Sequence, residues 1–473
     1  MIITDETRTA LPRHGARDTL NRFRMNTYGC FTRRGDALFE LADAIACSPA
    51  RVSDAARLSL EAEQERGHGG VYDALNAGRI NDARFVGVLT DTPIAKIVGP
   101  DGRPRIVLAV DVSNWLRPDA ATSPHRSFCH TYARGRGKAD MIPGWPYSFI
   151  AALEAGPTSW TAILDATRLS PGDDATAVTA DQLREVIDTL IRAGRWRPGD
   201  PDILIVADAG YDCPRLAWLL DNLPITIIGR VRSDRVYYAP AGTRAGPTRG
   251  RPPRHGARLG LREADTQHDP YLVTESDTDR YGHATARAFA QMHPKLETRG
   301  PWANHTGPAP IIDGTLIGLQ VERLPGDRDP KPVWLWASKP IPDSPDEVDH
   351  WWSMYIRRFD LEHTFRYLKQ HLGWTRAKLR DPDAADRWTA VVITAHTQLR
   401  LARPLAADCR LPWQPPLPVE KLTPARVRAG YRRIHQRLAH PAGPPQTSRP
   451  GPGRPKGQPN EHRAPVQPIG KAA

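Results

Sequence analysis

The sequence predicts an α/β protein in which a β-rich insertion interrupts the central sheet and helical regions flank it at both ends. Three short apolar runs rich in β-branched residues, at 106–112, 202–208 and 225–231, have the composition of buried strands. A helical pattern separates the second run from the third, which is typical of parallel strands joined by a helix. Helical patterns also fill residues 1–100 and return after residue 346.

Length and composition indicate a folded chain of several domains. The 473 residues are 40% hydrophobic and 25% charged, which are values of globular proteins. No apolar run approaches the ~20 residues that span a bilayer, and the N-terminus is polar, so we expect no membrane contact and no signal peptide. The five cysteines are scattered without a CxxC pair, which indicates a reducing, cytoplasmic location.

The charge is unevenly distributed along the chain. The net charge is +12, but residues 403–473 alone carry 13 basic and 3 acidic side chains. The first 402 residues hold 52 basic and 50 acidic side chains and are nearly neutral. A near-neutral body with a cationic C-terminal region indicates a polyanionic partner, of which nucleic acid is the usual one.

Residues 1–100 are expected to form an N-terminal helical domain. Apolar residues between Leu38 and Ile45 recur at helical spacing, and Ser48 followed by Pro49 predicts the start of a second helix. A bundle of this kind is suited either to binding DNA ends or to packing on the next domain. The sequence leaves both interpretations open.

Residues 101–232 are expected to form the first part of the core. Besides the three apolar runs, residues 158–165 predict a strand. A helix is predicted to begin at Thr179, because Gln182 completes a T-x-x-Q capping box. A short helix then precedes the third apolar run.

Residues 233–339 break this order and predict the β-rich insertion. They open with a loop of Pro, Gly and Arg at 240–254, and strands are predicted at 315–324 and 333–337. The helices of the second part of the core follow in residues 340–402.

The C-terminal region divides into a basic helical segment and a tail. In residues 403–440, a helix is predicted to begin at Thr423-Pro424 and to carry several arginines. Residues 441–473 contain nine prolines and are expected to be disordered, because such a composition cannot build a core.

Acidic residues stand at the ends of two of the predicted strands. Asp111 ends the first apolar run and Asp208 ends the second. Side chains at the carboxyl ends of parallel strands meet at one edge of a sheet, where functional sites are often built. A strand-terminal Asp is also common as a turn or cap residue, so each acid alone leaves both interpretations open.

One predicted helix carries a mixed polar face. At about 100° per residue, four of its side chains fall within roughly 60° of one another. They are Tyr355, Arg358, Glu362 and Lys369. This face is either a solvated stripe of charges or a functional site that combines an aromatic residue, an acid and two bases.

The spacing of these four residues resembles the Y-(2)-R-(3)-E-(6)-K signature of a large group of bacterial insertion-sequence transposases. The run Asp208-Ala-Gly-Tyr-Asp212 is similar to the second-acid motif of that group, and Val110-Asp111 is similar to its first. The resemblance covers roughly residues 100–402. It implies a cut-and-paste DDE enzyme with an RNase H-like core and a β-rich insertion before the catalytic Glu.

The resemblance also implies a metal site at Asp111, Asp208 and Glu362. Cleaving a phosphodiester requires an activated water and a stabilised leaving oxygen, and two Mg²⁺ ions about 3.5–4 Å apart supply both. Three carboxylates offer the oxygen ligands that Mg²⁺, or Mn²⁺ in its place, prefers. The sequence contains no GxxxxGK[ST] motif and no HxH or HxxxH spacing, so neither a nucleotide cofactor nor a histidine metal site is expected.

Several residues are expected to contact DNA. Arg358, Lys369 and Tyr355 would bind phosphates near the cut, unless Arg358 only pairs with Glu362 to hold the helix. Arg249 and Arg251 lie in an Arg-Gly-Arg-Pro run, and 453–456 forms a similar one. Such arginines either enter a narrow minor groove or bind phosphates without sequence preference.

A tryptophan of the insertion is expected to stack on a base flipped out near the transposon end, as in related transposases. Base–aromatic stacking contributes about 1–3 kcal/mol per base. Trp334 and Trp336 alternate with Leu335 and are suited to a core, whereas Trp302 follows Pro301 in a predicted loop and is the more available.

The resemblance therefore predicts metal-dependent cleavage at the terminal inverted repeats of an insertion sequence, followed by strand transfer into target DNA. Two DNA ends need two active sites, so we expect a homodimer assembled on double-stranded DNA of the bacterial nucleoid. Two alternatives stay open. One is an RNase H-like nuclease that cuts without joining, and the other is a regulator or domesticated derivative that only binds DNA.

Overall fold

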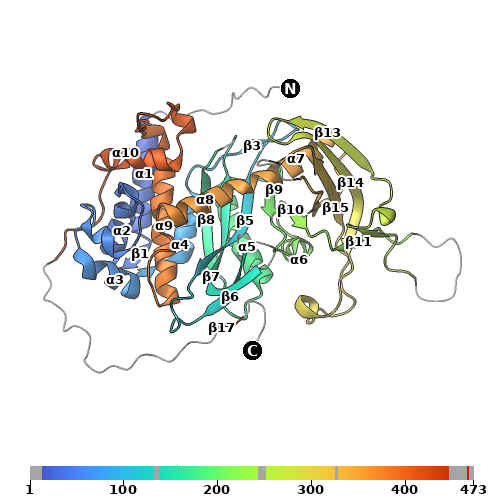
Figure 1. Ribbon diagram of the computed structural model, residues 1–473, viewed down its shortest axis with the longest axis horizontal. Helices are drawn as coiled ribbons and strands as arrows, with labels where there is room; N and C mark the ends of the chain where they lie inside the picture. The colour runs from blue at the N-terminus through green and yellow to red at the C-terminus, as the bar shows by residue number, and fades with distance from the viewer. Residues whose placement is uncertain are drawn as a thin grey trace.

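The computed structural model describes residues 13–132, 139–156, 158–242, 252–324, 329–446 and 466–467. A large mixed sheet forms its centre, with helices on both faces (Figure 1). Helices from both ends of the chain, blue and orange-red, gather at one end of the molecule in Figure 1, and strands from the 236–337 region lie at the other. No helix of the described residues is long and apolar enough to cross a membrane.

Five neighbouring strands form the middle of the sheet in the order β8-β7-β5-β9-β10. The strands β5, β9 and β10 run parallel, whereas β7 is antiparallel to both β5 and β8. Their bounds are Val107–Leu116 for β5, Ala139–Leu153 for β7, Thr161–Arg168 for β8, Ile203–Ala207 for β9 and Ile225–Val231 for β10. The strand β6 (Arg126–Tyr132) extends the β7 side, and β17 (Val466–Gln467) pairs with it in parallel.

Region 233–339 is rich in strands, and these continue the same sheet. The strand β16 pairs antiparallel with β10, with Trp336 opposite Gly229, and β15 and β14 follow outward. The strand predicted at 333–337 is confirmed, and the one predicted at 315–324 lies close to β15. The bounds are Val236–Tyr238 for β11, Arg258–Gly260 for β12, Leu272–Thr278 for β13, Gly282–Pro294 for β14, Gly314–Val321 for β15 and Val333–Ala337 for β16.

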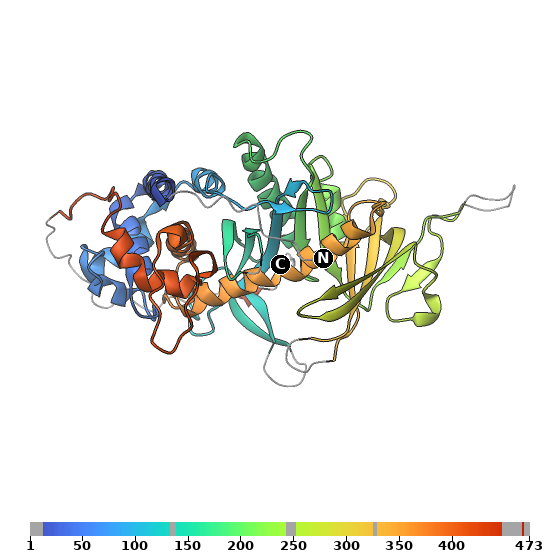
Figure 2. The ribbon, with the colours of Figure 1, turned by 90° about the horizontal axis from the view of Figure 1, so that it is seen from above.

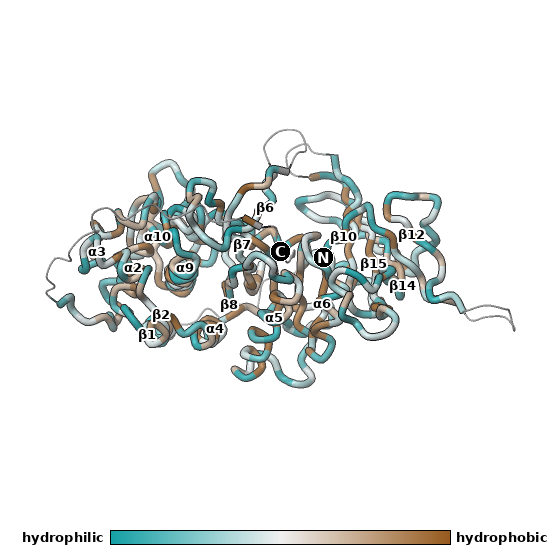
Figure 3. The backbone as a smooth tube through the Cα atoms, turned by 90° about the horizontal axis from the view of Figure 1, so that it is seen from below, coloured by the Kyte–Doolittle hydropathy of each residue, from teal (hydrophilic) through white to brown (hydrophobic). Residues whose placement is uncertain are grey.

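The two faces of the central sheet are covered by different helices. On one face, Leu108 and Val110 pack in a core with α5 (Ala175–Arg192) and α6 (Cys213–Leu219). On the other face, α7 (Pro345–Arg357) and α8 (Phe359–Gln370) lie end to end across the strands (Figure 2). Figure 3 shows the apolar residues gathered along the strands, with hydrophilic residues in the connecting loops.

The N-terminal helices pack against helices from the C-terminal part of the chain. Every residue of α2 from Ala37 to Cys47 is buried, and this helix contacts α3, α9 and α10. Of the two interpretations of residues 1–100, packing is therefore observed, and DNA binding by the outer surface stays a prediction. The helices are α1 (Arg13–Tyr28), α2 (Gly35–Cys47), α3 (Gly67–Ala77), α4 (Asp82–Thr90), α9 (Pro382–Ala402) and α10 (Pro424–His435).

Short elements connect these parts. Two small antiparallel pairs lie outside the large sheet. They join β1 (Phe31–Arg33) to β2 (Arg79–Ile80) and β3 (Ile97–Val98) to β4 (Pro104–Arg105). The 3₁₀ turns are η1 (Ala56–Leu60), η2 (Ala264–Thr266), η3 (Gly300–Trp302), η4 (Arg403–Leu405) and η5 (Val419–Lys421).

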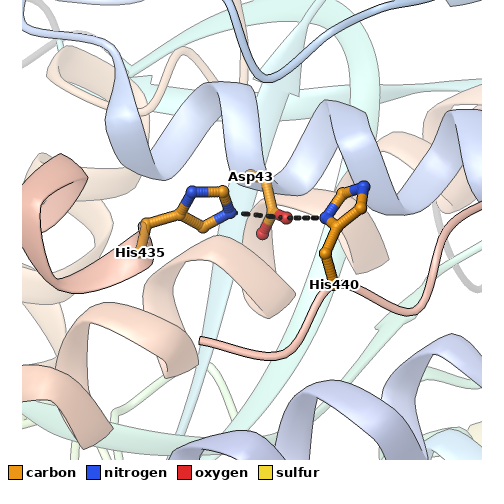
Figure 4. Close-up of side chains that lie close together, drawn as sticks. All are labelled: Asp43, His435 and His440. Carbon is orange, nitrogen blue, oxygen red and sulfur yellow. Dashed lines mark hydrogen bonds and ion pairs between the residues drawn. The ribbon is translucent and has the colours of Figure 1, made fainter. Parts of the chain in front are cut away.

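A buried ion pair connects α1 to α2 inside the group of helices. Both side chains, Arg24 and Asp43, are 0% exposed, and their atoms approach to 2.5 and 2.9 Å. Figure 4 shows His435 and His440 reaching the same carboxylate from the C-terminal segment, with His435 at 2.9 Å. Gln398 of α9 donates to it at 3.0 Å. Burial alone would raise the pKa of Asp43, but Arg24 and the two histidines hold it well below its ordinary value.

The same cluster has the residue types of a metal site, since Asp43, His435 and His440 present ligand atoms within 4.8 Å of one another. The carboxylate is already neutralised by the two-pronged contact with Arg24, whose guanidinium also lies 3.4 Å from the His435 ring. A divalent cation there would be repelled by this guanidinium. We therefore interpret the cluster as a structural connection between the two ends of the chain.

Two predicted helix starts were wrong. Ser48 ends α2 instead of beginning a helix, and only the 3₁₀ turn η1 follows it. The helix α5 begins at Ala175, because the carboxylate of Asp174 accepts a hydrogen bond from the Ala177 N–H at 3.2 Å and caps it. The proposed capping box lies inside α5, where Gln182 instead donates to Asp165 at 2.6 Å.

The C-terminal basic helix begins at Thr423-Pro424 as predicted, but part of its charge is used internally. Arg426 pairs with Asp408 at 3.1 Å, and Arg432 binds both Glu61 and Glu63. Arg433 and Arg437 stay exposed. The C-terminal excess of positive charge is therefore a weaker indication of DNA binding than the sequence suggests.

The tail prediction is tested at only a few positions. Most of residues 441–473, including the 453–456 run, lies outside the described residues. The expectation of disorder was wrong for Val466–Gln467, which form β17 beside β6. Backbone pairing with the free edge of a strand does not require an apolar composition, so the proline-rich sequence did not predict it.

A buried histidine is expected to make the fold sensitive to acid. His396 of α9 is 0% exposed, and neither ring nitrogen has a hydrogen-bond partner within the described ranges. Burial lowers its pKa to about 3. Between that value and the ordinary pKa, only the unfolded chain binds the proton, so stability falls as the pH decreases.

We expect the free energy of unfolding to lose about 1.4 kcal/mol per pH unit from this group below pH ~6. Thermal unfolding from pH 7 to 4.5 should therefore show a shallower pH dependence in His396→Leu than in the wild type. His68→Leu, at an exposed position, is the matched control. An unchanged pH dependence in His396→Leu would contradict the assignment.

Candidate active site

Two acids lie side by side at the middle of the sheet. The strands β5 and β9 are paired in parallel with Val110 opposite Ala207, and each chain continues directly into an acid, Asp111 and Asp208. Asp208 follows the end of β9, as predicted. Asp111 does not end its strand, because β5 continues to Leu116 and pairs with β7. The predicted strand end at Asp111 was therefore wrong, although the parallel pairing with β9 ends there.

Strand periodicity directs both acids to the same face of the sheet. Side chains alternate between faces, and Val107 and Ala109 belong to the core on the side of α7 and α8. The alternate residues of β9, Leu204 and Val206, belong to that core as well. The next positions in both series are the two acids, which therefore face the helices.

Glu362 comes to these acids from α8. The apolar residues Leu361, Phe365 and Leu368 are buried against the sheet, and the Glu362 side chain stays 44% exposed. The predicted single helix consists of two segments, because α7 ends at Arg357 and α8 begins at Phe359. We call Asp111, Asp208 and Glu362 the acid triad.

Arg358, at the junction of the two helices, contacts every member of the acid triad. Its guanidinium binds the Asp111 carboxylate directly through Nη1. The same nitrogen lies 3.8 Å from a Glu362 oxygen, and Nη2 lies 3.9 Å from Asp208 Oδ1. The predicted pair of Arg358 with Glu362 is present, but the closest partner of Arg358 is Asp111 on β5.

The other two residues of the mixed helix face border the same site. Tyr355 is buried, and burial together with the nearby charge of Asp208 raises its pKa to about 12. Burial lowers the pKa of Lys369, an effect that Glu362 and Asp111 oppose because they favour its charged form. Lys369 also lies 5.6 Å from the ring of Trp374.

The acid triad has the electrostatics of a cation site. Burial raises the pKa of Asp111 to about 7, and the charges of Glu362 and Asp208 add to the rise while Arg358 opposes it. Oxygen Oδ1 of Asp208 is buried without a hydrogen-bond partner in the described part of the chain. Three carboxylates with an unsatisfied oxygen offer the ligands that a hard divalent cation prefers. Their oxygens do not all lie within 4.8 Å of one another in this arrangement, in which Arg358 stands between them.

Not every acid of the Asp208-Ala-Gly-Tyr-Asp212 run belongs to this site. The Asp212 carboxylate accepts a hydrogen bond from the Arg215 N–H at 3.1 Å and caps α6. Its role is therefore structural. Sequence reasoning did not single out Arg230, which is exposed on β10 and close enough to Tyr355 to affect its pKa. Its position near the end of a predicted core strand was the signal in the sequence that could have identified Arg230.

The other residues predicted to contact DNA are the tryptophans of region 233–339 and two arginines. Trp302 is only 7% exposed and packs edge-on against Trp218, so the expectation that it is available for stacking was wrong. Its loop folds onto α6, which the preceding proline did not indicate. Trp334 and Trp336 are buried, as the core interpretation predicted. Arg249 and Arg251 lie outside the described residues.

Three carboxylates of this kind are the ligand set expected of enzymes that act on phosphate esters with divalent metal ions. Comparison with protein families agrees, because residues 26–295, more than half of the chain, match the family described as DDE superfamily endonuclease. The chain belongs to this family of nuclease-type enzymes, whose substrate is DNA and which generally use divalent metal ions. The comparison with curated proteins found no match. The matched segment contains Asp111 and Asp208 but ends before Glu362.

Proposed function

We propose that this protein is a DNA transposase that binds the terminal inverted repeats of an insertion sequence, cleaves there and transfers the freed strand to target DNA. The observation that carries the proposal is the convergence of the acid triad from three separate segments around one arginine. The Y-(2)-R-(3)-E-(6)-K spacing, which supplies that arginine and Glu362, favours a transposase over a nuclease.

The order of the strands supports an RNase H-like core. An antiparallel series β5-β7-β8 is followed by the helix α5 and by β9 and β10, which pair in parallel beside β5. In this interpretation, residues 233–339 are an insertion between the second and third acids. It would extend the core sheet from β10 and bring its outer strands to the end of the molecule away from α9 and α10.

In the proposed mechanism, Asp111, Asp208 and Glu362 are the residues that would hold two Mg²⁺ ions. Bound there, the metal would activate the attacking water or 3′ hydroxyl and neutralise the leaving oxygen. The protein contributes the placement of the three carboxylates on two strands and one helix. Arg358 and Lys369 bind the phosphates that flank the cut, and the Tyr355 hydroxyl orients the same backbone.

The proposed function also implies an oligomeric state. Two ends must be cut, so a dimer assembled on DNA supplies two copies of the acid triad. Exposed arginines such as Arg433 and Arg437 in the C-terminal part would add non-specific phosphate contacts.

The proposal is tested with linear DNA that carries the sequences flanking the gene, mixed with a supercoiled plasmid as target. With Mg²⁺, we expect cleavage at the ends and linear DNA joined to the plasmid, and with EDTA we expect neither. Supplied ends that already carry a free 3′ hydroxyl should be joined without prior cleavage. Cleavage without joining would favour the RNase H-like nuclease instead. Tight binding without metal-dependent chemistry would favour a DNA-binding derivative.

A further inference from the structure

Arg358 is in the position of a cation at the centre of the acid triad. Its guanidinium binds Asp111 directly and lies 3.8 and 3.9 Å from oxygens of Glu362 and Asp208. The side chain is only 12% exposed, so it is held inside the site and does not extend into solvent. A planar guanidinium offers donors on several edges, which suits it to three carboxylates at once.

The contacts of Arg358 are less complete than those of the buried Arg24–Asp43 pair. Its Nε atom and Asp208 Oδ1 are both buried without a hydrogen-bond partner among the described residues. By contrast, both nitrogens Nη1 and Nη2 of Arg24 bind the two oxygens of Asp43, at 2.5 and 2.9 Å. An unpaired buried Nε is also found in the ion-paired Arg105 and Arg400, so the unpaired Asp208 oxygen is the more informative of the two atoms. A buried carboxylate oxygen left unpaired is costly, which favours a further ligand at this position.

Arg358 occupies one of the oxygen atoms that a metal ion would need. Oδ1 of Asp111 accepts a hydrogen bond from the Val112 N–H at 2.8 Å, and Oδ2 is bound by Arg358. A divalent cation that takes Oδ2 would stand close to the guanidinium, and the two positive charges repel one another. Metal and Arg358 therefore compete for this carboxylate.

The position of Arg358 allows its side chain to leave. It joins α7 to α8, and the backbone there makes i→i+3 hydrogen bonds from the Arg358 N–H to Tyr355 and from the Leu361 N–H to Arg358, both of 3.0 Å. A 3₁₀ turn within a helix often marks a hinge. The neighbouring Phe359 is 44% exposed, so the junction lies at the protein surface.

We propose that Arg358 is an internal counter-ion that occupies the acid triad in the absence of DNA and is drawn away by a DNA phosphate, so that substrate binding opens the site to metal. This inference rests on the proposed function. A phosphate accepts two parallel hydrogen bonds from a guanidinium, so it is a suitable alternative partner. The exchange would keep the enzyme from holding its metal ions until DNA is in place.

The test is the binding of Mn²⁺ to the full chain, measured by calorimetry without DNA. Arg358→Gln is expected to bind the first Mn²⁺ at least about 10-fold more tightly than the wild type, because the competing cation is gone. Arg366→Gln removes the same charge from an exposed position of the same helix and should change the affinity much less. A short DNA duplex should tighten Mn²⁺ binding by the wild type but not by Arg358→Gln, after subtraction of binding to the duplex alone.

Thermal unfolding shows whether a variant that binds Mn²⁺ differently is still folded. Without metal, Arg358→Gln should melt below the wild type, because three carboxylates lose their cation, and Mn²⁺ should restore it. Arg358→Lys keeps the charge but cannot span the acid triad, so its Mn²⁺ affinity should lie between the other two.

Equal or weaker Mn²⁺ binding by Arg358→Gln would overturn the inference, and so would an equal gain in Arg366→Gln. If neither the wild type nor any of the variants bound Mn²⁺, both this inference and the metal site of the proposed function would be rejected. Tighter Mn²⁺ binding by Arg358→Gln, combined with an absence of strand joining by the wild-type protein, would support the inference and reject only the transposase.

Discussion

Replacement of Glu362 by Gln is expected to abolish metal-dependent DNA cleavage, lowering the rate at least about 10³-fold. Gln keeps the shape of the side chain but removes the negative charge that would hold a divalent ion next to Asp111 and Asp208. Because the Glu362 side chain is 44% exposed and packs little, the fold should be unaffected. The measurement is cleavage of the flanking-end DNA in Mg²⁺, together with the melting temperature.

Asp181→Asn is the matched control for this substitution. It removes one negative charge from an exposed position of α5, on the opposite face of the sheet, and should leave cleavage within about twofold of the wild type. Cleavage by Glu362→Gln at the wild-type rate would contradict the assignment of Glu362 as a metal ligand. Only Asp111 and Asp208, which lie within the matched segment 26–295, would then remain as candidates.

Replacement of Asp43 by Asn is expected to give the largest loss of stability, about 3–5 kcal/mol. The change leaves the Arg24 guanidinium, which is 0% exposed, without its counter-charge inside the protein. It also weakens the contacts of His435 and Gln398 that connect α10 and α9 to α2. The measurement is the shift in the thermal or denaturant unfolding curve.

A surface ion pair provides the comparison. Arg34 and Asp73 approach to 2.8 Å with side chains about half exposed, so Asp73→Asn should cost no more than about 1 kcal/mol. Replacing Arg24 and Asp43 together by apolar residues should recover much of the loss, because neither charge is then buried alone. A small effect of Asp43→Asn would show that the connection between the two ends of the chain contributes little.

Regular apolar patterns predicted the middle of the fold well. The strands at 225–231 and 333–337 have the predicted bounds. Both are short, are rich in β-branched or aromatic residues, and pair with a neighbouring strand on each side. The strand β7 was missed, since Pro143 and Pro146 interrupt a segment that otherwise alternates. The buried series Trp145, Tyr147 and Phe149 was the signal that could have revealed it.

The site was predictable as a set of residues but not as an arrangement. Helical spacing places Arg358 next to Glu362, four positions away, yet nothing local relates it to Asp111, 247 positions earlier. That contact depends on the pairing of β5 with β9 and on the seating of α8 over both strands. The Asp43 cluster was missed for the same reason, since its partners come from α1, α9 and α10.

The central claim is that the acid triad holds the metal ions that cleave DNA. Its most direct test is cleavage by Asp208→Cys in Mg²⁺ and in Mn²⁺, because a thiolate is a poor ligand for Mg²⁺ and a better one for the softer Mn²⁺. We predict that this variant is inactive with Mg²⁺ and regains cleavage with Mn²⁺, while the wild type is active with both. Two results would contradict the assignment of Asp208 as a metal ligand, provided that the variant melts like the wild type. One is cleavage with Mg²⁺ at the wild-type rate, and the other is an absence of cleavage with both Mg²⁺ and Mn²⁺.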